Sequence, residues 1–323
     1  MHEIRDIASF IAPNKGISIA LGRFDGVHVG HRAIIDRAVA HARDNDLTPV
    51  CFSFREETYH RMESHDCLTT DDEKIHLIEK LGIEMLLHPA LELPLTNTEP
   101  DAFVNSLLLD RWNSKFIVAG YDFHFGHNRS GDSLLLKKLA GDRAMVDILE
   151  PVKVDGEIVK ATAIRFLLRD GKIEHANKLL GYPYSVIQRQ VPGQHLGTRI
   201  GFPTLNFNWP DQKVMPPYGV YAVRVSLLPS KETDGNSSKA LADGAAGFGL
   251  RPTVQKDRIE PILEVNILNP DRLSEAFKIP EVSDRTFKIK FHEFIRAERK
   301  FDSLDALQEQ IGKDIEKVRE ILQ

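Results

Sequence analysis

Two histidines in a glycine-rich turn carry the clearest chemistry in this sequence. His28 and His31 lie three positions apart with Gly30 between them, so both can face one phosphate from the start of a helix. Residues 17–21 form an apolar run typical of a buried strand, and residues 33–41 have apolar side chains at helical spacing. A strand, a glycine-rich turn and a helix start together point backbone N–H groups and the helix dipole at an anion. The stretch therefore predicts a phosphate-binding site.

The residues before the histidines make this motif more specific. They read Gly22-Arg23-Phe24-Asp25-Gly26, and with His-x-Gly-His they resemble the nucleotide-binding signature of adenylyl- and cytidylyltransferases. In those enzymes the histidine pair stabilises charge on the α- and β-phosphates during nucleotidyl transfer. The resemblance implies that His28 and His31 are catalytic and that the ATP phosphates are contacted by Gly22, Arg23, Phe24, Asp25 and Gly30. A plain surface turn is the alternative interpretation.

Length and composition limit the kind of protein. At 323 residues the chain is long enough for two domains, and 42% hydrophobic and 28% charged residues are typical of a globular protein. The net charge of −5 gives no footprint for nucleic acid or an anionic membrane. Apolar stretches of membrane-spanning length, a signal-peptide pattern and a cysteine framework are all missing. We expect a cytoplasmic protein with small-molecule partners and neither nucleic acid nor membrane among them; its oligomeric state is not specified.

The first half alternates between strand-like and helix-like segments. Apolar runs indicate strands at residues 17–21, 49–54, 83–87 and 116–120, and helical patterns lie between them at 33–41, 70–81 and 102–112. This alternation predicts a doubly wound, mostly parallel sheet of the Rossmann-like kind. Ligands of such sheets bind at the carboxyl ends of the strands, where residues 22–31 and 120–132 both fall.

After about residue 183 the pattern changes. Short strand candidates at 185–191, 220–227, 262–268 and 287–294 are separated by turns, which predicts a small antiparallel β-barrel. We expect a polar hairpin loop over residues 229–239 and a terminal amphipathic helix over 304–322, capped by Asp302 or Ser303. The chain is therefore expected to form an α/β domain over residues 1–182 and a β domain over residues 183–323.

Residues 120–132 form a long loop with unusual chemistry. Phe123 and Phe125 flank a histidine between Asp122 and Gly126, which suits stacking on a planar ring with a carboxylate to fix it. The loop resembles the flavin-binding loop of bacterial FAD synthetase modules. The resemblance implies flavin contacts from Asp122, Phe123, Phe125 and Asp132, and a turn-capping role for Asp122 is the alternative.

A metal-binding pattern lies in the second half. Gly201-Phe202-Pro203-Thr204-Leu205-Asn206 is similar to the Pro-Thr-x-Asn signature of riboflavin kinases, in which hard oxygen ligands hold Mg²⁺ and ADP phosphate. The resemblance implies metal ligands at Thr204 and Asn206, ATP contacts at Gly201 and Pro203, a general base at Glu264 and a flavin contact at Arg296. The residues alone also allow turn positions at Thr204 and Asn206, a solvated Glu264, and a surface ion pair of Arg296 with Glu298.

Taken in order, these segments resemble the prokaryotic bifunctional riboflavin kinase/FAD synthetase family over nearly the whole chain. The resemblance implies two reactions that use ATP and Mg²⁺. Riboflavin is phosphorylated to FMN, with Glu264 deprotonating the 5′-hydroxyl. FMN is then adenylylated to FAD, with His28 and His31 stabilising the transition state.

Several positions depart from the family pattern. Where the family reads Ile-Ser-Ser-Thr-Arg-Ile-Arg, this chain has residues 159–165, Val-Lys-Ala-Thr-Ala-Ile-Arg, which leaves Thr162 and Arg165 as the matching ATP contacts. Arg23 replaces an asparagine, and its charge can compensate at the same phosphates. Other replacements are Arg55-Glu56-Glu57 for Pro-His-Pro, Gly247 for asparagine and Asn266 for histidine. These changes leave a second hypothesis: a catalytically impaired or single-activity paralogue that binds flavin or nucleotide in a regulatory or carrier role.

Overall fold

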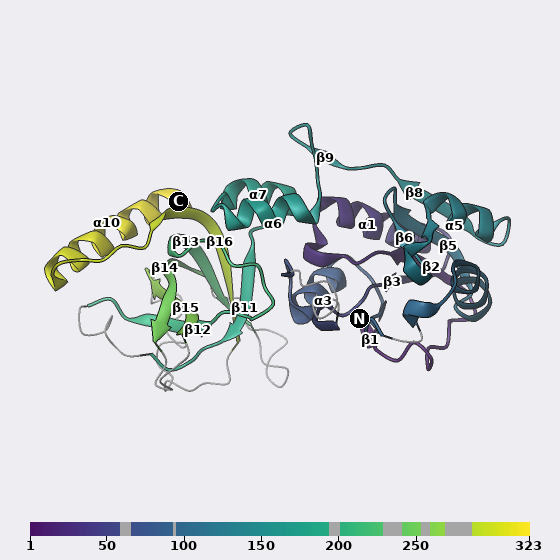
Figure 1. Ribbon diagram of the computed structural model, residues 1–323, viewed down its shortest axis with the longest axis horizontal. Coiled ribbons are helices and arrows are strands. Elements are labelled where there is room, and N and C mark those ends of the chain that lie inside the picture. Colours follow the sequence, from purple (N-terminus) through teal and green to yellow (C-terminus); the bar gives the residue numbers. More distant parts are fainter. Residues whose placement is uncertain (59–65, 93–94, 194–200, 229–240, 253–258, 269–285) are drawn as a thin grey trace. The chain divides into compact units, whose positions relative to one another are not determined.

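The contacts of the chain divide it into two units, Met1–Ala163 and Ile164–Gln323. The computed structural model describes residues 1–58, 66–92, 95–193, 201–228, 241–252, 259–268 and 286–323 (Figure 1). The expected boundary at 182/183 lies later than this division, which assigns helix α7 (Ile173–Leu180) to the second unit. The physical reason is Asn177, which donates to the carbonyl of Phe291 at 2.9 Å and accepts from the backbone N–H of Tyr184 at 2.7 Å.

A six-stranded parallel sheet forms the centre of the first unit, with strand order β1-β4-β3-β2-β5-β8. The strands are β1 (His2–Ile4), β2 (Ile17–Leu21), β3 (Thr48–Phe52), β4 (Met85–Leu87), β5 (Ser114–Gly120) and β8 (Met145–Leu149). The order departs from β2 in two directions, so a topological switch point lies between β2 and β5. The predicted doubly wound sheet is confirmed, and the two loops singled out in the sequence follow these neighbouring strands.

Helices connect the parallel strands. They are α1 (Val29–Asp44), α3 (Asp71–Glu79), the short α4 (Pro100–Ala102) and α5 (Ser133–Ala140). Helix α6 (Ala161–Arg169) follows the last parallel strand and spans the division between the units. Helix α3 begins at a capping box in which Thr70 accepts from the backbone N–H of Glu73 and the Glu73 carboxylate accepts from that of Thr70. Short elements complete the unit: β6 (His124–Phe125) with β7 (Gly131–Asp132), β9 (Lys153–Val154) with β10 (Glu157–Ile158), and single 3₁₀ turns.

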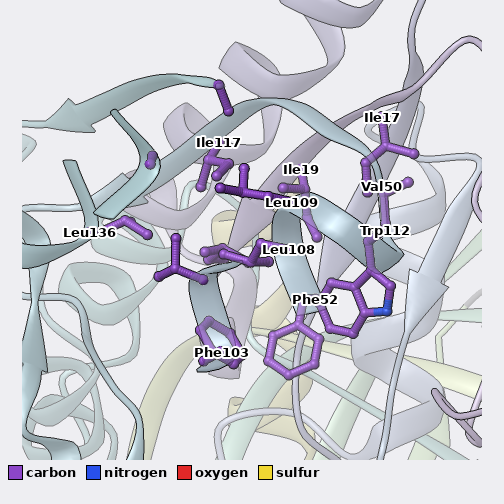
Figure 2. Close-up of a cluster of buried hydrophobic side chains, with 14 of the residues drawn as sticks. Ile17, Ile19, Val50, Phe52, Phe103, Leu108, Leu109, Trp112, Ile117 and Leu136 are labelled. Carbon is purple, nitrogen blue, oxygen red and sulfur yellow. The ribbon is translucent and has the colours of Figure 1, made fainter. Parts of the chain in front are cut away.

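The helix predicted over residues 102–112 is a π-helix for most of its length, from Phe103 to Arg111. The backbone N–H of Trp112 donates to the carbonyl of Leu107, five residues earlier, at 2.8 Å. The wider turn lets Phe103, Leu108 and Trp112 pack in one hydrophobic core with residues of β2, β3 and β5 (Figure 2). This core fixes the strands whose carboxyl ends carry the two loops.

An antiparallel sheet with order β11-β16-β13-β14-β15-β12 forms the second unit. Its strands are β11 (Ser185–Arg189), β12 (Thr204–Asn208), β13 (Gly219–Leu227), β14 (Leu241–Pro252), β15 (Ile259–Ile267) and β16 (Thr286–Ala297). An isolated bridge between Val191 and Asn206 joins its two edges, so the predicted antiparallel barrel is confirmed. The loop predicted over residues 229–239 lies outside the described residues.

The chain ends with helix α10 (Leu304–Leu322), which is capped by the Ser303 hydroxyl. Ile315, Val318 and Leu322 of this helix pack on Ala222 of β13 and Ala245 of β14. The predicted terminal helix therefore covers part of one face of the second sheet. Over the parts of the chain that the structure describes, no helix combines the length and apolarity that crossing a membrane requires.

Candidate active sites

The turn after β2 has a strained backbone. Phe24, Gly26 and Val27 have φ values of 53°, 77° and 37°, in the left-handed region that a β-branched residue such as valine rarely adopts. Strain of this kind persists only where surrounding contacts hold it, and it clusters at functional sites. Helix α1 begins directly after the turn, at Val29, with His28 as its N-cap. The shape of the turn therefore determines where the helix start lies.

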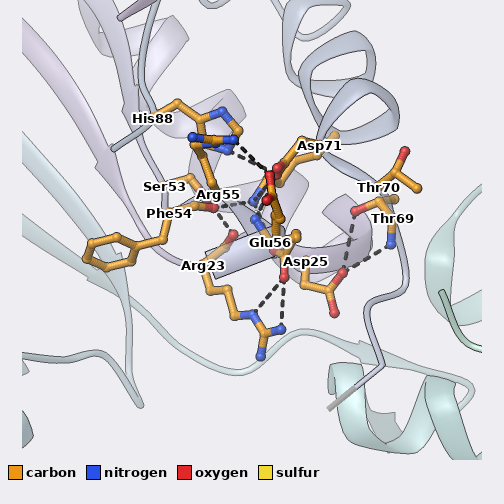
Figure 3. Close-up of polar contacts among 12 residues, drawn as sticks. Arg23, Asp25, Ser53, Phe54, Arg55, Glu56, Thr69, Thr70, Asp71 and His88 are labelled. Atoms are coloured by element: carbon orange, nitrogen blue, oxygen red, sulfur yellow. Dashed lines mark hydrogen bonds and ion pairs between the residues drawn. The ribbon is translucent and has the colours of Figure 1, made fainter. Parts of the chain in front are cut away.

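The Asp25 carboxylate holds this turn in place. It is buried, and its Oδ1 accepts hydrogen bonds from the backbone N–H groups of Leu68 at 2.8 Å and Thr69 at 3.1 Å (Figure 3). The Thr69 hydroxyl in turn accepts from the backbone N–H of Gly26 at 3.1 Å. Asp25, predicted as a phosphate contact, thus braces the turn against the segment that leads into α3.

The two predicted catalytic histidines lie against each other. His28 is the N-cap residue of α1, and its Nδ1 accepts a hydrogen bond from the backbone N–H of His31 at 3.3 Å. Their rings stack with centroids 3.5 Å apart, and the Phe24 ring meets His31 edge-on at 5.3 Å. A Cβ at Gly30 would lie 3.3 Å from the His28 ring, and one at Gly22 would lie 2.9 Å from the Phe24 ring. Both glycines therefore leave room for the rings that the sequence placed in the phosphate site.

Arg23 forms an ion pair with Glu56. Its Nε and Nη2 donate to Oε2 of Glu56 at 3.2 and 2.8 Å, and Oε1 accepts from Lys74 Nζ at 2.9 Å. Glu56 and Lys74 are buried, whereas the Arg23 side chain is 21% exposed. Burial raises the pKa of Glu56 against the opposing charges of Lys74 and Arg23. Arg23 and Glu56, which both depart from the family pattern, are thus partners.

The ion cluster continues through Asp71 and His88. Asp71 Oδ1 accepts from the backbone N–H of Glu56 at 2.7 Å and lies 3.4 Å from His88 Nε2. His88 Nδ1 lies 2.9 Å from a carboxylate oxygen of Glu3. Burial acts to raise the pKa of Asp71, but the adjacent His88 imidazole and the charge of Lys74 lower it to about 2. The cluster therefore ties β1, the segment after β3 and α3 together.

The loop after β5 packs partly into the core of the first unit. The Phe123 and Phe125 rings lie nearly parallel with centroids 5.6 Å apart; Phe125 is buried and Phe123 packs against the same core. Asp132 Oδ1 accepts from the backbone N–H of Leu135 at 2.8 Å and caps α5. Asp122 is exposed just beyond the carboxyl end of β5. Of the four flavin contacts predicted in this loop, only Asp122 is described without a packing or capping role.

Thr162 and Arg165 both lie on α6. Thr162 is exposed in the first turn of the helix, and Arg165 is buried one turn later. The contacts of these two residues with ATP phosphates stay predictions.

Polar side chains from β12 and β15 meet on one face of the second sheet. The antiparallel register places Asn206 opposite Glu264 and Thr204 opposite Asn266, and directly opposed residues project to the same face. Asn266 Nδ2 also donates to the carbonyl of Pro203 at 2.9 Å. The predicted metal ligands and the predicted base are therefore neighbours, and Asn266 holds the backbone of the Pro-Thr-x-Asn segment.

Asn206 carries an oriented carboxamide. Its Nδ2 donates to the carbonyl of Thr204 at 3.3 Å, and its buried Oδ1 has no hydrogen-bond partner in the described parts of the chain. A buried acceptor without a partner costs about 1–3 kcal/mol, so this oxygen is suited to accept a bond from a ligand. Gly201, at the start of the segment, has a φ of 85°, and a Cβ there would meet nothing within 4 Å.

The same row of side chains continues across the sheet to Arg296. The register pairs Glu264 with Gly247, Gly247 with Val220, and Val220 with Arg296. A Cβ at Gly247 would meet only the Glu264 carbonyl, at 3.9 Å. In the row from Glu264 to Arg296, the position of Gly247 therefore carries no side chain, which leaves space above the sheet there.

Arg296 anchors helix α10. Its Nε lies 2.9 and 3.0 Å from the two carboxylate oxygens of Asp314, its Nη2 donates to Oδ2 at 2.7 Å, and Gln310 Nε2 donates to Oδ1 at 2.8 Å. Asp314 is buried, and the alternative of an ion pair between Arg296 and Glu298 is replaced by this pair. A flavin contact of Arg296 stays a prediction.

Sequence reasoning missed Asp314 and Lys74 as partners. Asp314, Val318 and Leu322 follow one another at intervals of four, so Asp314 lies within the apolar stripe of α10. A charge in such a stripe requires a buried partner, and that signal was available. Lys74 faces inward on α3 in the same way, next to Leu77 and Ile78.

Comparisons with known proteins assign both units. A family model described as FAD synthetase matches residues 11–163, and one described as riboflavin kinase matches residues 180–322. The bifunctional riboflavin kinase/FMN adenylyltransferase of Bacillus subtilis is 32% identical over 92% of this chain and 89% of its own. The protein of the same name from Escherichia coli K12 is 32% identical over 94% and 92%.

A solved structure from Streptococcus pneumoniae, titled as a macrolide-efflux protein, matches 98% of both chains at 28% identity with a TM-score of 0.81. Together with the two family models, the curated relatives define a two-module flavin-nucleotide enzyme. The chain belongs to the family of bifunctional riboflavin kinases/FMN adenylyltransferases.

The lowered pKa of Asp71 makes an acid-sensitive contribution to stability. Its carboxyl pKa falls from an ordinary 3.8 to about 2 on folding, so the contribution is present above pH 3.8 and is lost as the pH falls toward 2. Asp71→Asn should lower the free energy of unfolding at pH 7 by about 2 kcal/mol. The difference from the parent chain should shrink between pH 4 and pH 2 in urea unfolding curves.

Asp72→Asn is the matched control, because Asp72 is an exposed carboxylate in the same helical turn. It should cost at most about 0.5 kcal/mol, the scale of an exposed charge near a helix start. A loss at Asp71 that stays constant from pH 7 to pH 2 would show that its carboxylate is not held as described.

The Arg296–Asp314 pair should contribute strongly to the stability of the second unit. Asp314→Ala leaves a guanidinium beside the buried face of α10, and removing one member of such a pair costs about 3 kcal/mol. Glu320→Gln, which breaks an exposed pair with Lys317 on the same helix, should leave the free energy of unfolding nearly unchanged. Equal effects of the two substitutions in urea titrations would contradict the anchoring role.

Proposed function

We propose that the second module phosphorylates riboflavin to FMN and that the first module adenylylates FMN to FAD, each with ATP. The observation that carries the proposal is the position of Glu264 opposite Asn206 on one face of the second sheet. In the transfer of a phosphoryl group to an alcohol, a carboxylate can accept the hydroxyl proton, and an amide oxygen beside it can hold the metal ion that accompanies the nucleotide. In the first module, the stacked histidines His28 and His31 are placed to stabilise charge on a phosphate.

In the kinase reaction Glu264 accepts the proton of the riboflavin 5′-hydroxyl. The resulting oxygen nucleophile attacks the γ-phosphorus of ATP, and the bond to the β,γ-bridging oxygen breaks to release ADP. Asn206 and Thr204 lie on the neighbouring strand, where they hold the nucleotide end of the reaction. Asn266 supports them because it binds the carbonyl of Pro203.

The donor set fits a magnesium ion. Mg²⁺ prefers oxygen ligands, and the buried Asn206 Oδ1 lacks a hydrogen-bond partner within the described chain. Asn206 and Thr204 would hold the ion, which when bound neutralises charge on the ATP phosphates. Backbone groups of Gly201 and Pro203 complete the proposed nucleotide contacts.

In the adenylyltransferase reaction a phosphate oxygen of FMN attacks the α-phosphorus of ATP. The bond to the α,β-bridging oxygen breaks, and pyrophosphate leaves. His28, His31 and the N-terminus of α1 stabilise the negative charge that develops on the α-phosphate. Gly22, Phe24, Asp25 and Gly30 shape this site. Further ATP contacts come from Arg23, Thr162 and Arg165. Asp122 is the proposed flavin contact with an exposed carboxylate, joined by Phe123, Phe125 and Asp132. Arg296 is the proposed flavin contact of the second module.

The two activities should be separable by substitution. His28→Ala or His31→Ala should lower FAD formation from supplied FMN by about 100-fold or more, because each removes charge stabilisation in the transition state. FMN formation from riboflavin should stay within about twofold of the parent rate, because Glu264 lies in the other unit. Chromatographic separation of riboflavin, FMN and FAD measures both rates in one assay.

Glu264→Gln should give the reverse pattern: loss of about 100-fold or more in riboflavin phosphorylation, with FAD formation from FMN retained. The glutamine keeps the shape of the side chain and removes the proton acceptor. Parent-like phosphorylation by Glu264→Gln would show that another group is the base. Equal loss of both activities in the histidine variants, with folding intact, would refute the assignment of one reaction to each module.

A further inference from the structure

Gly193 lies against the carboxamide of Asn206. Just past β11, the backbone N–H of Val191 donates to the carbonyl of Asn206 at 2.8 Å, in the bridge that joins the two edges of the second sheet. Two residues later, a Cβ placed on Gly193 would lie 2.4 Å from Asn206 Nδ2 and 3.1 Å from its Cγ. Real Cβ atoms do not approach other atoms so closely, so a side chain at Gly193 would displace the carboxamide.

Gly193 is needed because a side chain would collide with Asn206, and not because its backbone has a conformation that only glycine adopts. Gly193 is not among the glycines with positive φ, so its backbone is one that alanine can adopt. An alanine at this position therefore acts through its methyl group. The group that it strikes is the same carboxamide whose Nδ2 is held by the Thr204 carbonyl and whose Oδ1 has no partner in the described structure.

We infer that Gly193 is a positioning residue for the kinase reaction: its missing side chain sets the orientation of the Asn206 carboxamide and so directs Oδ1 at the magnesium–nucleotide site. The inference rests on the proposed function of Asn206 as a ligand. Residues that orient a metal ligand typically change metal affinity or activity by about 10–100-fold when they are altered. The effect is confined to the nucleotide side of the site, because Gly193 contacts Asn206 and the base lies on β15.

The test uses the full-length chain and its Gly193→Ala variant. Calorimetric titration with ADP should show that Mg²⁺ strengthens binding in the parent chain and that this strengthening falls by about tenfold in the variant. The first module contributes the same heat in both proteins, because it is unchanged. In kinase assays the concentration of Mg²⁺ at half-maximal rate should rise by about tenfold, while FAD formation from FMN stays at the parent rate.

A double-mutant cycle with Asn206→Ala separates this role from general packing. Asn206→Ala removes the atoms that the new methyl group would strike, so adding Gly193→Ala to it should cost nothing further. Losses that add in the double variant would overturn the inference, as would a parent-like response of Gly193→Ala to Mg²⁺. Gly312→Ala is the matched control, because a Cβ there meets nothing within 4 Å on α10, and it should leave ADP binding unchanged.

Failure of the inference and failure of the proposed function are distinguishable. If the parent chain phosphorylates riboflavin and Asn206→Ala reduces that rate while Gly193→Ala does not, only the role of Gly193 is wrong. If Asn206→Ala has no effect, Asn206 is not a ligand, and the proposed function fails at that residue together with the inference.

Discussion

The hydrogen bonds that the buried Asp25 carboxylate accepts are the constraint on which the first module depends. The turn after β2 contains three residues with positive φ, one of them a valine, and this backbone is unfavourable on its own. Asp25 offsets that cost by binding the backbone before α3, and Thr69 completes the link through Gly26. The start of α1 and the position of the stacked histidines both follow from the shape of that turn.

Three of the residues that depart from the family pattern, Arg23, Glu56 and Asn266, make contacts that support the sites. Arg23 and Glu56 replace residues in two separate motifs, yet they bind each other, with Lys74 as a third member. Asn266 replaces a histidine and holds the Pro203 carbonyl beside the proposed metal ligands. Such substitutions alter which side chains support a site without removing the support. The replacements at Lys160, Ala161 and Ala163 have no such explanation in the structure.

The sequence predicted the layers and the loops, because strand and helix periodicity is local information. It did not predict β14, where Gly244, Gly247 and Gly249 dilute the alternation typical of strands. It also missed the role of Arg296, since the partner Asp314 lies 18 residues away and is brought close only by the packing of α10. The π-helix was missed for a related reason: its wider turn depends on how Phe103 and Trp112 reach a common core. Asp25 and Asp132 lie in motifs that resemble binding loops, yet their carboxylates accept backbone hydrogen bonds, whereas Asp122 of the same kind of loop is exposed. That difference depends on tertiary packing, which local sequence patterns do not specify.

The bridge between Val191 and Asn206 has a consequence for the folding thermodynamics of the second module. The carbonyl of Asn206 accepts the hydrogen bond that joins the two edges of the barrel, and the side chain of the same residue is proposed to hold the nucleotide's metal ion. A ligand that binds only the barrel with this bridge formed shifts the equilibrium between open and closed barrel toward the closed state by mass action. Nucleotide binding and formation of the bridge between Val191 and Asn206 are then thermodynamically linked. The free energy needed to open this bridge should therefore rise with the fraction of kinase sites that hold nucleotide.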